Sequence, residues 1–434
     1  MNHQPVQARL ITSKGALLVL LMAVGAYAAF IRYSQGLGAS TNLSDQYPWG
    51  LWIGVDVMSG VALAAGGFIA AALVYLFGGD KYYPLVRPAV LTGLLGYAFV
   101  GIGLLVDLAL PWHIWHAVIY WPEHSVMFEV AWCVMLYLTV LGLEFAQPVL
   151  ERFGLTGKTM TAWRLCSNGF AVVALSFFVG AMSLSWQWAA VTLVFTSVLA
   201  TVLWRIGPRR PGVPIMLIVA GVILSTMHQS SLGSLFLLMK GKLHALWWSP
   251  ALPINFFLSA VAVGFAIVIF EATLSAKAFG RPIEKDVLSG MGRFLGYALW
   301  IYMGFRAFDL AAQGASAQVV AGPKSNLFLL EMAAGFLLPA VMLSSPKLRE
   351  HTGARFLAAT LVVLGTVFNR CNVAWLAMDM PGEGTYVPSL YEILITVSIA
   401  AALMLFFALG VKVFPVFATE EERTSMPSPG GASA

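Results

Sequence analysis

Long apolar segments recur along nearly the whole chain and are separated by short polar connections. Each segment contains about 17 to 25 residues, which is enough for a helix to cross roughly 30 Å of hydrocarbon while satisfying its own backbone hydrogen bonds. The short alternating strands that build a transmembrane barrel do not occur. The pattern therefore predicts an all-α, polytopic integral membrane helix bundle.

The apolar pattern predicts twelve membrane spans. The fifth and sixth are separated only by SLSWQW, so they could instead form one irregular hairpin, which would leave ten spans. Ten and twelve spans keep the orientation of all the others, whereas eleven would not. The predicted spans are residues 15–33, 50–77, 88–110, 125–148, 165–184, 187–206, 212–229, 252–275, 293–312, 325–344, 354–373 and 388–413.

The regions outside the spans are short. We predict a cytoplasmic N-terminal segment at 1–14, one transmembrane domain at 15–413 and a disordered cytoplasmic tail at 414–434, where the sequence is polar. Arg9 and Lys14 precede the first span as they would in a cleaved signal peptide. We interpret this span as an uncleaved anchor.

Composition and charge agree with a membrane protein. The chain is 59% hydrophobic and 10% charged, against roughly 25% charged in soluble domains. Lys and Arg accumulate in short cytoplasmic loops, and this rule places both termini in the cytoplasm. The net charge of +5 therefore reports topology and does not indicate nucleic-acid binding. The basic residues left on or near the outer side are Arg32, Lys240, Lys242, Arg306, Lys324 and Arg370.

Motifs for metals and nucleotides are missing. The three cysteines lie far apart and lack the C-x-x-C spacing of iron–sulfur and zinc sites. Only His228 lies near a helix end, so two facing histidines for a haem are not expected. No Walker motif and no G-x-G-x-x-G after a strand occurs. We expect no haem, no iron–sulfur cluster and no other metal in this chain. The histidines expected in loops are His3, His113, His116, His124, His244 and His351.

Ionisable residues inside the spans are unusually frequent. A charge in the hydrocarbon layer costs at least about 2.5 to 3.5 kcal/mol, so such residues usually face an interior cavity or a pathway. Glu144 and Glu271 fall in inner halves of spans, Arg87 at the inner mouth and Tyr97 between the layers. In the outer halves lie Asp56, Asp107, Glu129, Asp309, Glu331 and Glu392, together with Arg306, Arg370 and His228.

Two interpretations of these residues stay open. One is a set of structural ion pairs, in which two arginines each meet an outer carboxylate. The other is a proton route, because the acids outnumber their basic partners and would then be protonated or exchange protons in a hydrated interior. The ion-pair candidates are Arg306, Asp309, Glu331, Arg370 and Glu392, and the proton-path candidates are Arg87, Tyr97, Glu129, Glu144 and Glu271.

The stretch STMHQSSLGS, at 225–234, ends an apolar run with many hydrogen-bonding groups. It could simply cap the free carbonyls of a helix end. It also offers what a quinone needs, namely donors to its carbonyl oxygens and a group that passes protons. We therefore take His228 and Gln229 as candidate quinone-binding residues.

Several phrases resemble a known family. YPWGLWIGVDVMSGVALAAGG, YYPLVRPAVLTGLLGY, SVMFEVAWCVMLYLTVLGLEFA, STMHQSSLGSL and IVIFEATL are similar to sequences of the NrfD/PsrC family of quinone-interacting membrane subunits. Within it the likeness is strongest to the HybB branch, the membrane subunits of quinone-linked [NiFe]-hydrogenases. It extends from about residue 10 to residue 415.

The resemblance implies a subunit without haem or metal that exchanges electrons between menaquinone or ubiquinone and a periplasmic, ferredoxin-like iron–sulfur subunit. In HybB-like relatives that subunit serves the large and small subunits of a [NiFe]-hydrogenase. Elsewhere in the family the partner is a molybdopterin enzyme or a multihaem cytochrome. Carried over by motif, the polar path contains Arg87, Tyr97, Glu129, His228 and Glu271, and Asp56 and Asp107 are possible neighbours of the quinone.

One departure from the HybB pattern is an insertion of roughly 45 residues near 165–210, with the content of an extra hairpin. It leaves open a relative that serves another catalytic partner. A proton-coupled secondary transporter is a competing function, but inverted repeats and broken helices are not evident. A passive anchor is a third possibility, and it would have little use for the acids in the spans.

Overall fold

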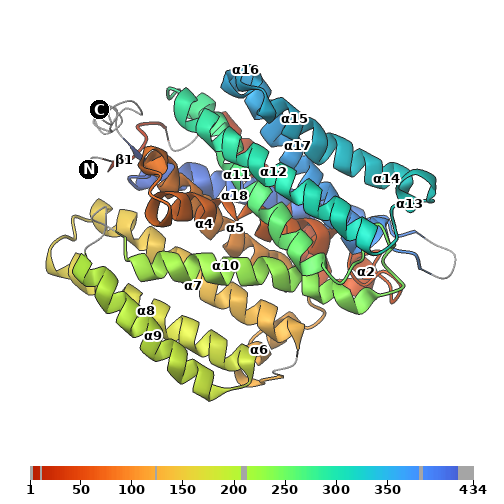
Figure 1. Cartoon of the computed structure of the whole chain (residues 1–434), viewed down its shortest axis with the longest axis horizontal. Coiled ribbons are helices and arrows are strands. Elements are labelled where there is room, and N and C mark those ends of the chain that lie inside the picture. The colour runs from red at the N-terminus through yellow and green to blue at the C-terminus, as the bar shows by residue number, and fades with distance from the viewer. Residues whose placement is uncertain (1–2, 10–11, 123–124, 207–212, 381–384, 419–434) are drawn as a thin grey trace.

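The structure is a computed structural model that describes residues 3–9, 12–122, 125–206, 213–380 and 385–418. Long helices lie side by side along the longest axis of the molecule (Figure 1). Their apolar side chains form one large core within the bundle. The sequence predictions for His124 and for the tail from residue 419 lie outside the described residues.

The first half of the chain builds α1 and the helices that carry most of the predicted polar path. Short 3₁₀ and π-helical pieces, labelled η, interrupt or extend them. The elements are α1 (Ser13–Gln35), α2 (Leu37–Ser40), η1 (Trp52–Ser59), α3 (Gly60–Leu63), α4 (Gly66–Ala71), η2 (Ala72–Leu76), η3 (Asp80–Leu85), α5 (Val86–Asp107), η4 (Pro111–His113), α6 (His116–Ile119), α7 (Val126–Arg152), α8 (Lys158–Ser183) and α9 (Trp186–Ile206).

The second half continues the bundle with helices of similar length. In Figure 1, α11, α12, α15 and α17 lie together on the side away from α8 and α9. The elements are α10 (Ile215–Leu235), η5 (Phe236–Met239), α11 (Leu252–Phe279), α12 (Lys285–Ala312), α13 (Gln318–Ala321), α14 (Ser325–Leu330), η6 (Glu331–Leu337), α15 (Leu338–Ser344), α16 (Pro346–Glu350), α17 (Thr352–Cys371), η7 (Asn372–Leu376) and α18 (Leu390–Val413).

Each predicted span coincides with a helix or a run of helical pieces. Among the described residues, 11 helices are long and apolar enough to cross a membrane, and the protein is a multi-pass integral membrane protein. The ninth predicted span, 293–312, is absent from that set because α12 is less apolar than the other long helices, although it has 28 residues. The fifth and sixth are two separate helices of 26 and 21 residues, and not a partial hairpin.

Two short strands hold the ends of the described chain together. β1 (His3–Gln4) pairs antiparallel with β2 (Phe417–Ala418), and the Val6 amide donates to the Val411 carbonyl at 2.9 Å. The start of α1 and the end of α18 therefore lie at the same end of the bundle, here called the strand end. This requires an even number of crossings, which favours twelve spans with α12 included. The cytoplasmic location of this end stays a prediction.

Several spans contain π-helical turns, in which one extra residue bulges from the helix. Three of these pieces hold a buried polar side chain, namely Asp56 in η1, Glu331 in η6 and Asn372 in η7. A π-helical turn reorients the side chains around it and frees backbone groups, and it is frequent at functional sites. The irregular backbone is thus concentrated where polar groups enter the apolar core.

Gly335 and Gly365 let two of these irregular helices approach closely. A Cβ atom added at Gly335 would lie 2.7 Å from the Cα atom of Gly365, a distance that real Cβ atoms do not tolerate. The close approach brings η6 against α17. It places Glu331, at the start of η6, within hydrogen-bonding reach of the end of α17.

Candidate functional site

Helix α5 carries three polar side chains at successive depths from the strand end, here called the polar line, although each points about 140° around the helix from the one before it. Arg87, Thr92 and Tyr97 lie on it at intervals of five residues and all three make side-chain hydrogen bonds to other helices or to the chain end. At 1.5 Å per residue the line extends for about 15 Å, which is about half of the hydrocarbon thickness. It therefore leads from the strand end to the middle of the bundle.

The polar line ends in the middle of the bundle with a hydrogen-bonded pair, Tyr97 and His228. The hydroxyl oxygen of Tyr97 and Nδ1 of His228 are 2.9 Å apart, and both side chains are fully buried. The ring of Tyr137 packs edge-on against Tyr97, with centroids 4.6 Å apart. The pair joins α5 to α10 across the core and places an imidazole and a phenol together.

Two buried polar atoms near this pair have no hydrogen-bond partner among the described residues, namely Nε2 of His228 and Oε1 of Gln229. Gln229 uses its amide nitrogen to donate to the Val61 carbonyl at 2.8 Å. Buried polar groups are almost always satisfied in folded proteins, so such a group of orphans indicates water or a ligand.

Glu129 lies farther from the strand end than His228. It accepts a short hydrogen bond from the hydroxyl of Ser231, which follows His228 by one helical turn on α10. The side chain is half-buried, in the first turn of α7. Glu129, which the sequence placed with His228 on the polar path, therefore contacts the STMHQSSLGS stretch of α10 through Ser231.

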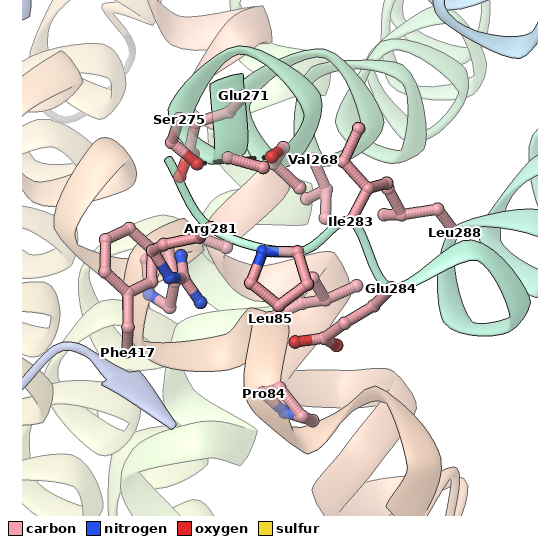
Figure 2. A pocket seen from close by; sticks show the side chains of 15 residues that line it. Pro84, Leu85, Val268, Glu271, Ser275, Arg281, Ile283, Glu284, Leu288 and Phe417 are labelled. Atoms are coloured by element: carbon pink, nitrogen blue, oxygen red, sulfur yellow. Dashed lines mark hydrogen bonds between the residues drawn. The ribbon is translucent and has the colours of Figure 1, made fainter. Parts of the chain in front are cut away.

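Glu271 and Thr92 form a second polar contact, closer to the strand end than the Tyr97–His228 pair. The Thr92 hydroxyl donates to Oε2 of Glu271 at 2.6 Å. Glu271 also lines a cavity of about 30 Å³ that continues to Ser275, Arg281 and Phe417, enough space for water. Figure 2 shows Glu271 and Ser275 on one helix, with Arg281 stacked against the Phe417 ring next to them.

Arg87 closes the line at the strand end. Its two terminal nitrogens bind the two oxygens of Glu151 at 2.7 and 2.8 Å, and one of them also donates to the Pro415 carbonyl at 2.8 Å. Gln147 donates to the same carboxylate at 2.8 Å. Glu144 is buried nearby and borders a cavity of about 20 Å³ together with Arg87 and Gln147.

Asp56 and Asp107 lie apart from His228. Oδ2 of Asp56 accepts from the Thr396 hydroxyl of α18 at 2.6 Å. Asp107 ends α5, where Arg32 of α1 donates to the Val106 and Leu108 carbonyls on either side of it. Among the described residues, no hydrogen bond joins either aspartate to His228 or Gln229. The structure groups these aspartates with α1 and α18, and not with the MHQSS stretch.

A separate polar cluster occupies the second half of the bundle. Arg306 and Asp309 form a buried ion pair at 2.8 Å, and Arg306 also donates to the Leu246 carbonyl. Asp309 accepts further from Asn255 at 2.8 Å and from Gln313 at 2.9 Å. The charges are thus matched and hydrogen-bonded, as a buried ion pair requires.

Glu331 and Arg370 belong to the same half but do not contact each other directly. Glu331 accepts hydrogen bonds from Trp247, Asn369 and Asn372 at 2.6 to 2.8 Å. Arg370 donates to the Asn369 amide oxygen at 2.5 Å, and its guanidinium lies 3.7 Å from the centre of the Phe256 ring. The expected arginine–carboxylate contact is therefore mediated by Asn369.

Glu392 has no basic partner among the described residues. It accepts from the amides of Asn42 and Ser389 and from the hydroxyl of Tyr386, and with Ser389 it forms a capping box at the start of α18. Burial and the neighbouring carboxylate raise the pKa of Tyr386, which keeps this phenol a donor. Glu392 therefore fixes a helix start.

The residues that the sequence reasoning missed are the neutral partners of the acids. Thr92, Thr396, Asn369 and Asn372 each donate to a carboxylate within the helix bundle. Single threonines and asparagines in apolar helices carry no distinctive pattern, because most of them bond their own backbone. Spacing gives no signal either, because Arg87, Thr92 and Tyr97 are five residues apart and so point about 140° away from one another around α5.

Comparison with known proteins gives a consistent result along the chain. A sequence model of the family described as polysulphide reductase, NrfD, matches residues 39–377. A protein of Nitratidesulfovibrio vulgaris is 33% identical over 96% of this chain and 97% of its own length. The probable Ni/Fe-hydrogenase 2 b-type cytochrome subunit of Escherichia coli is 29% identical, with 96% of each chain covered. The integral membrane subunit of menaquinone reductase from Nitratidesulfovibrio vulgaris is 27% identical over 92% of this chain and 90% of its own.

The name of the Escherichia coli relative includes a b-type cytochrome, which raises the question whether the residues of this chain fit a haem. Such a haem needs two imidazoles from facing helices. Among the described residues, His228 is the only histidine within a membrane-spanning helix, and its Nδ1 contacts Tyr97. No group of three or more His, Cys, Asp or Glu that could hold a metal ion occurs in the described ranges. These residues do not fit a bis-histidine haem.

Proposed function

Since this chain belongs to the polysulphide reductase (NrfD) family, we propose that it is the quinone-binding membrane subunit of a respiratory oxidoreductase complex. The observation that supports this most directly is the buried Tyr97–His228 pair, at 2.9 Å, beside the unpartnered Nε2 of His228 and Oε1 of Gln229 on α10. A quinone carbonyl would accept a hydrogen bond from Nε2 of His228, and a quinol hydroxyl would donate to Oε1 of Gln229. Both residues lie in the STMHQSS part of α10.

The chemistry is the two-electron reduction of a quinone, in which two electrons and two protons convert its two carbonyl groups into two hydroxyl groups. The quinone supplies the redox chemistry, and the protein supplies position and protons. An imidazole and a phenol in contact can relay a proton by exchanging their hydrogen bond, because each group both donates and accepts. In the reverse direction the same groups accept protons from the quinol.

Protons would reach the pair from the strand end. Arg87 and Glu144 border one water-sized cavity, and Glu271 borders another. Thr92 connects Glu271 to α5 one and a half turns before Tyr97. This arrangement supports a route that alternates carboxylates with water, and Glu129 on the far side of His228 would connect the site to the opposite surface. With the strand end in the cytoplasm, protons would be taken from the inside.

Electrons would arrive from a periplasmic, ferredoxin-like iron–sulfur subunit docked at the end opposite the strands. The similarity to a chain named as a hydrogenase subunit supports the large and small subunits of a [NiFe]-hydrogenase as the catalytic partner. The similarity to a subunit of menaquinone reductase supports menaquinone as the carrier, with ubiquinone as the alternative. A molybdopterin or multihaem enzyme is the alternative partner.

A single substitution in the purified complex tests the quinone site. His228→Ala removes the imidazole, and we expect donor-driven quinone reduction in membranes to be lost while the complex still assembles. His351→Ala is the matched control, because His351 is an exposed residue that caps α17 at the strand end. Undiminished turnover in assembled His228→Ala complex would remove His228 from the site.

A further inference from the structure

A pocket of about 220 Å³ lies between the α8–α9 hairpin and the start of α10, away from the polar line of α5. Its volume far exceeds what a single water molecule requires. Arg164 and Asn168 of α8 form its polar part. The rest of its wall is largely apolar and consists of Ala200, Leu203, Trp204, Val213, Pro214 and Ile215.

The depth of this pocket matches the boundary between lipid headgroups and hydrocarbon. Arg164 lies six residues after the start of α8, which is about 9 Å along the helix. Trp204 lies close to the end of α9 and is exposed, and tryptophan side chains favour this interfacial level. The long side chain of Arg164 can extend from the apolar region toward the headgroups.

The pocket lining has one polar part and one apolar part, as a phospholipid has a polar headgroup and apolar acyl chains. The Arg164 guanidinium presents several N–H donors in a geometry that suits phosphate. The amide oxygen of Asn168 is buried without a hydrogen-bond partner among the described residues, so it can accept from a headgroup hydroxyl. Leu203 and Ile215 offer an apolar surface along which an acyl chain would lie.

We propose that this pocket binds an anionic glycerophospholipid of the leaflet at the strand end, with its phosphate on Arg164 and its headgroup hydroxyl on Asn168. Basic pockets between transmembrane helices on the cytoplasmic side are typical sites for anionic lipid headgroups. A free phosphate would leave the apolar wall uncovered. A quinone lacks the negative charge that the guanidinium favours.

The lipid would fasten the hairpin to the helix that carries His228. Helix α9 packs mainly on α8 and is exposed over most of its surface, whereas α8 packs on α7 and α10. A lipid in the pocket touches all three of α8, α9 and α10 and fills the space between them. The site is independent of the proposed quinone chemistry, because none of its residues belongs to the polar line.

Lipid retention by the purified full-length chain tests this proposal. We expect native mass spectrometry after detergent exchange to show bound phosphatidylglycerol at an affinity at least about fivefold higher than that for phosphatidylcholine. Arg164→Gln should weaken phosphatidylglycerol at least about fivefold. Arg205→Gln, which removes an exposed cation of α9 outside the pocket, should leave it unchanged. Leu203→Trp should weaken both lipids by filling the pocket, and Asn168→Leu should weaken phosphatidylglycerol in a variant whose size-exclusion profile matches the wild type.

Three results would overturn the proposal. The first is equal retention of phosphatidylglycerol by the wild type, Arg164→Gln and Asn168→Leu. The second is displacement of the lipid by inorganic phosphate alone, which would make the pocket an anion site. The third is displacement by decylubiquinone at stoichiometric concentration, which would make it a quinone site. Since the readout is bound lipid, a failure here would leave the His228 experiment unaffected.

Discussion

The hydroxyl oxygen of Tyr97 lies 2.9 Å from Nδ1 of His228, and the contact joins α5 and α10 in the middle of the bundle. The two residues are 131 positions apart in the sequence, and both side chains are fully buried. Because α5 also carries Thr92 and Arg87, the contact connects the STMHQSS stretch to a polar line that reaches the strand end.

Tyr97→Phe should impair quinone reduction without unfolding the protein. The substitution removes only the hydroxyl that contacts His228, and a proton relay of this kind typically contributes 10²-fold or more. We expect turnover to fall about 100-fold, measured as donor-driven quinone reduction by the purified complex. Tyr302→Phe is the control, since Tyr302 is equally buried but packs on Phe336 in the other half. A Tyr97→Phe complex with wild-type turnover would show that the hydroxyl passes no proton.

Arg87 should hold the strand end together through its paired contacts. Arg87→Gln leaves the Pro415 carbonyl without its charged donor and breaks the two bonds to Glu151, at an expected cost of about 1–3 kcal/mol. Arg87→Lys keeps the charge but loses the planar guanidinium that binds both oxygens of Glu151. Its melting temperature in detergent should therefore lie between those of the wild type and Arg87→Gln. Arg152→Gln is the control, because this exposed arginine makes one bond, to the Val413 carbonyl. Equal melting temperatures for all three variants would refute the stabilising role.

Glu331 should be required for stability and not for electron transfer. Glu331→Ala leaves the donors of Trp247, Asn369 and Asn372 buried without an acceptor, and we expect a loss of about 2–5 kcal/mol. Glu350→Ala, at an exposed position, should cost less than about 0.5 kcal/mol. The check is thermal unfolding in detergent. A stable Glu331→Ala protein that no longer supports quinone reduction would place this acid in the functional machinery instead.

The pairing of β1 with β2 should weaken in acid. Burial, and next the charge of Arg87, lower the pKa of His3 from 6.5 to about 3. A detached strand takes up a proton near pH 6.5, whereas the paired strand stays neutral, so the pairing is at full strength above that pH and loses about 2 kcal/mol by pH 5.

Spin labels on Gln4 and Ala418 measure this pairing directly as a distance. We expect one short distance at pH 8 and a broad, longer distribution at pH 5. His3→Gln removes the titrating group and should abolish the pH dependence. A short distance at pH 5 in the wild type would contradict the burial of a neutral His3.

Much of the helical architecture follows from the sequence because apolar length and charge asymmetry act on whole segments. The predicted spans coincide with helices, and the hairpin at 165–206 forms two of them. The interruptions do not follow, since nothing in WIGVDVMS or in EMAAGFL marks a π-helical turn. Such turns depend on how a buried polar group finds partners in neighbouring helices.

The site was predictable only in part. Histidine, tyrosine and acids are rare enough in apolar helices to mark a polar interior, and the structure brings Tyr97 to His228. The family resemblance made Asp56 a possible neighbour of the quinone near His228, but a motif does not fix the direction in which a side chain points. The structure turns Asp56 toward Thr396 of α18. Facing directions depend on packing between distant segments, which single-sequence patterns do not encode.

The most direct test of the account is the pH inside liposomes that contain the purified complex with the strand end facing the lumen. Donor-driven quinone reduction should make the lumen more alkaline in step with turnover, and Glu271→Gln should suppress both because it removes the carboxyl group next to Thr92. Glu350→Gln should behave as the wild type. Quinone reduction at the full rate with no change in luminal pH would contradict a proton route from the strand end to His228.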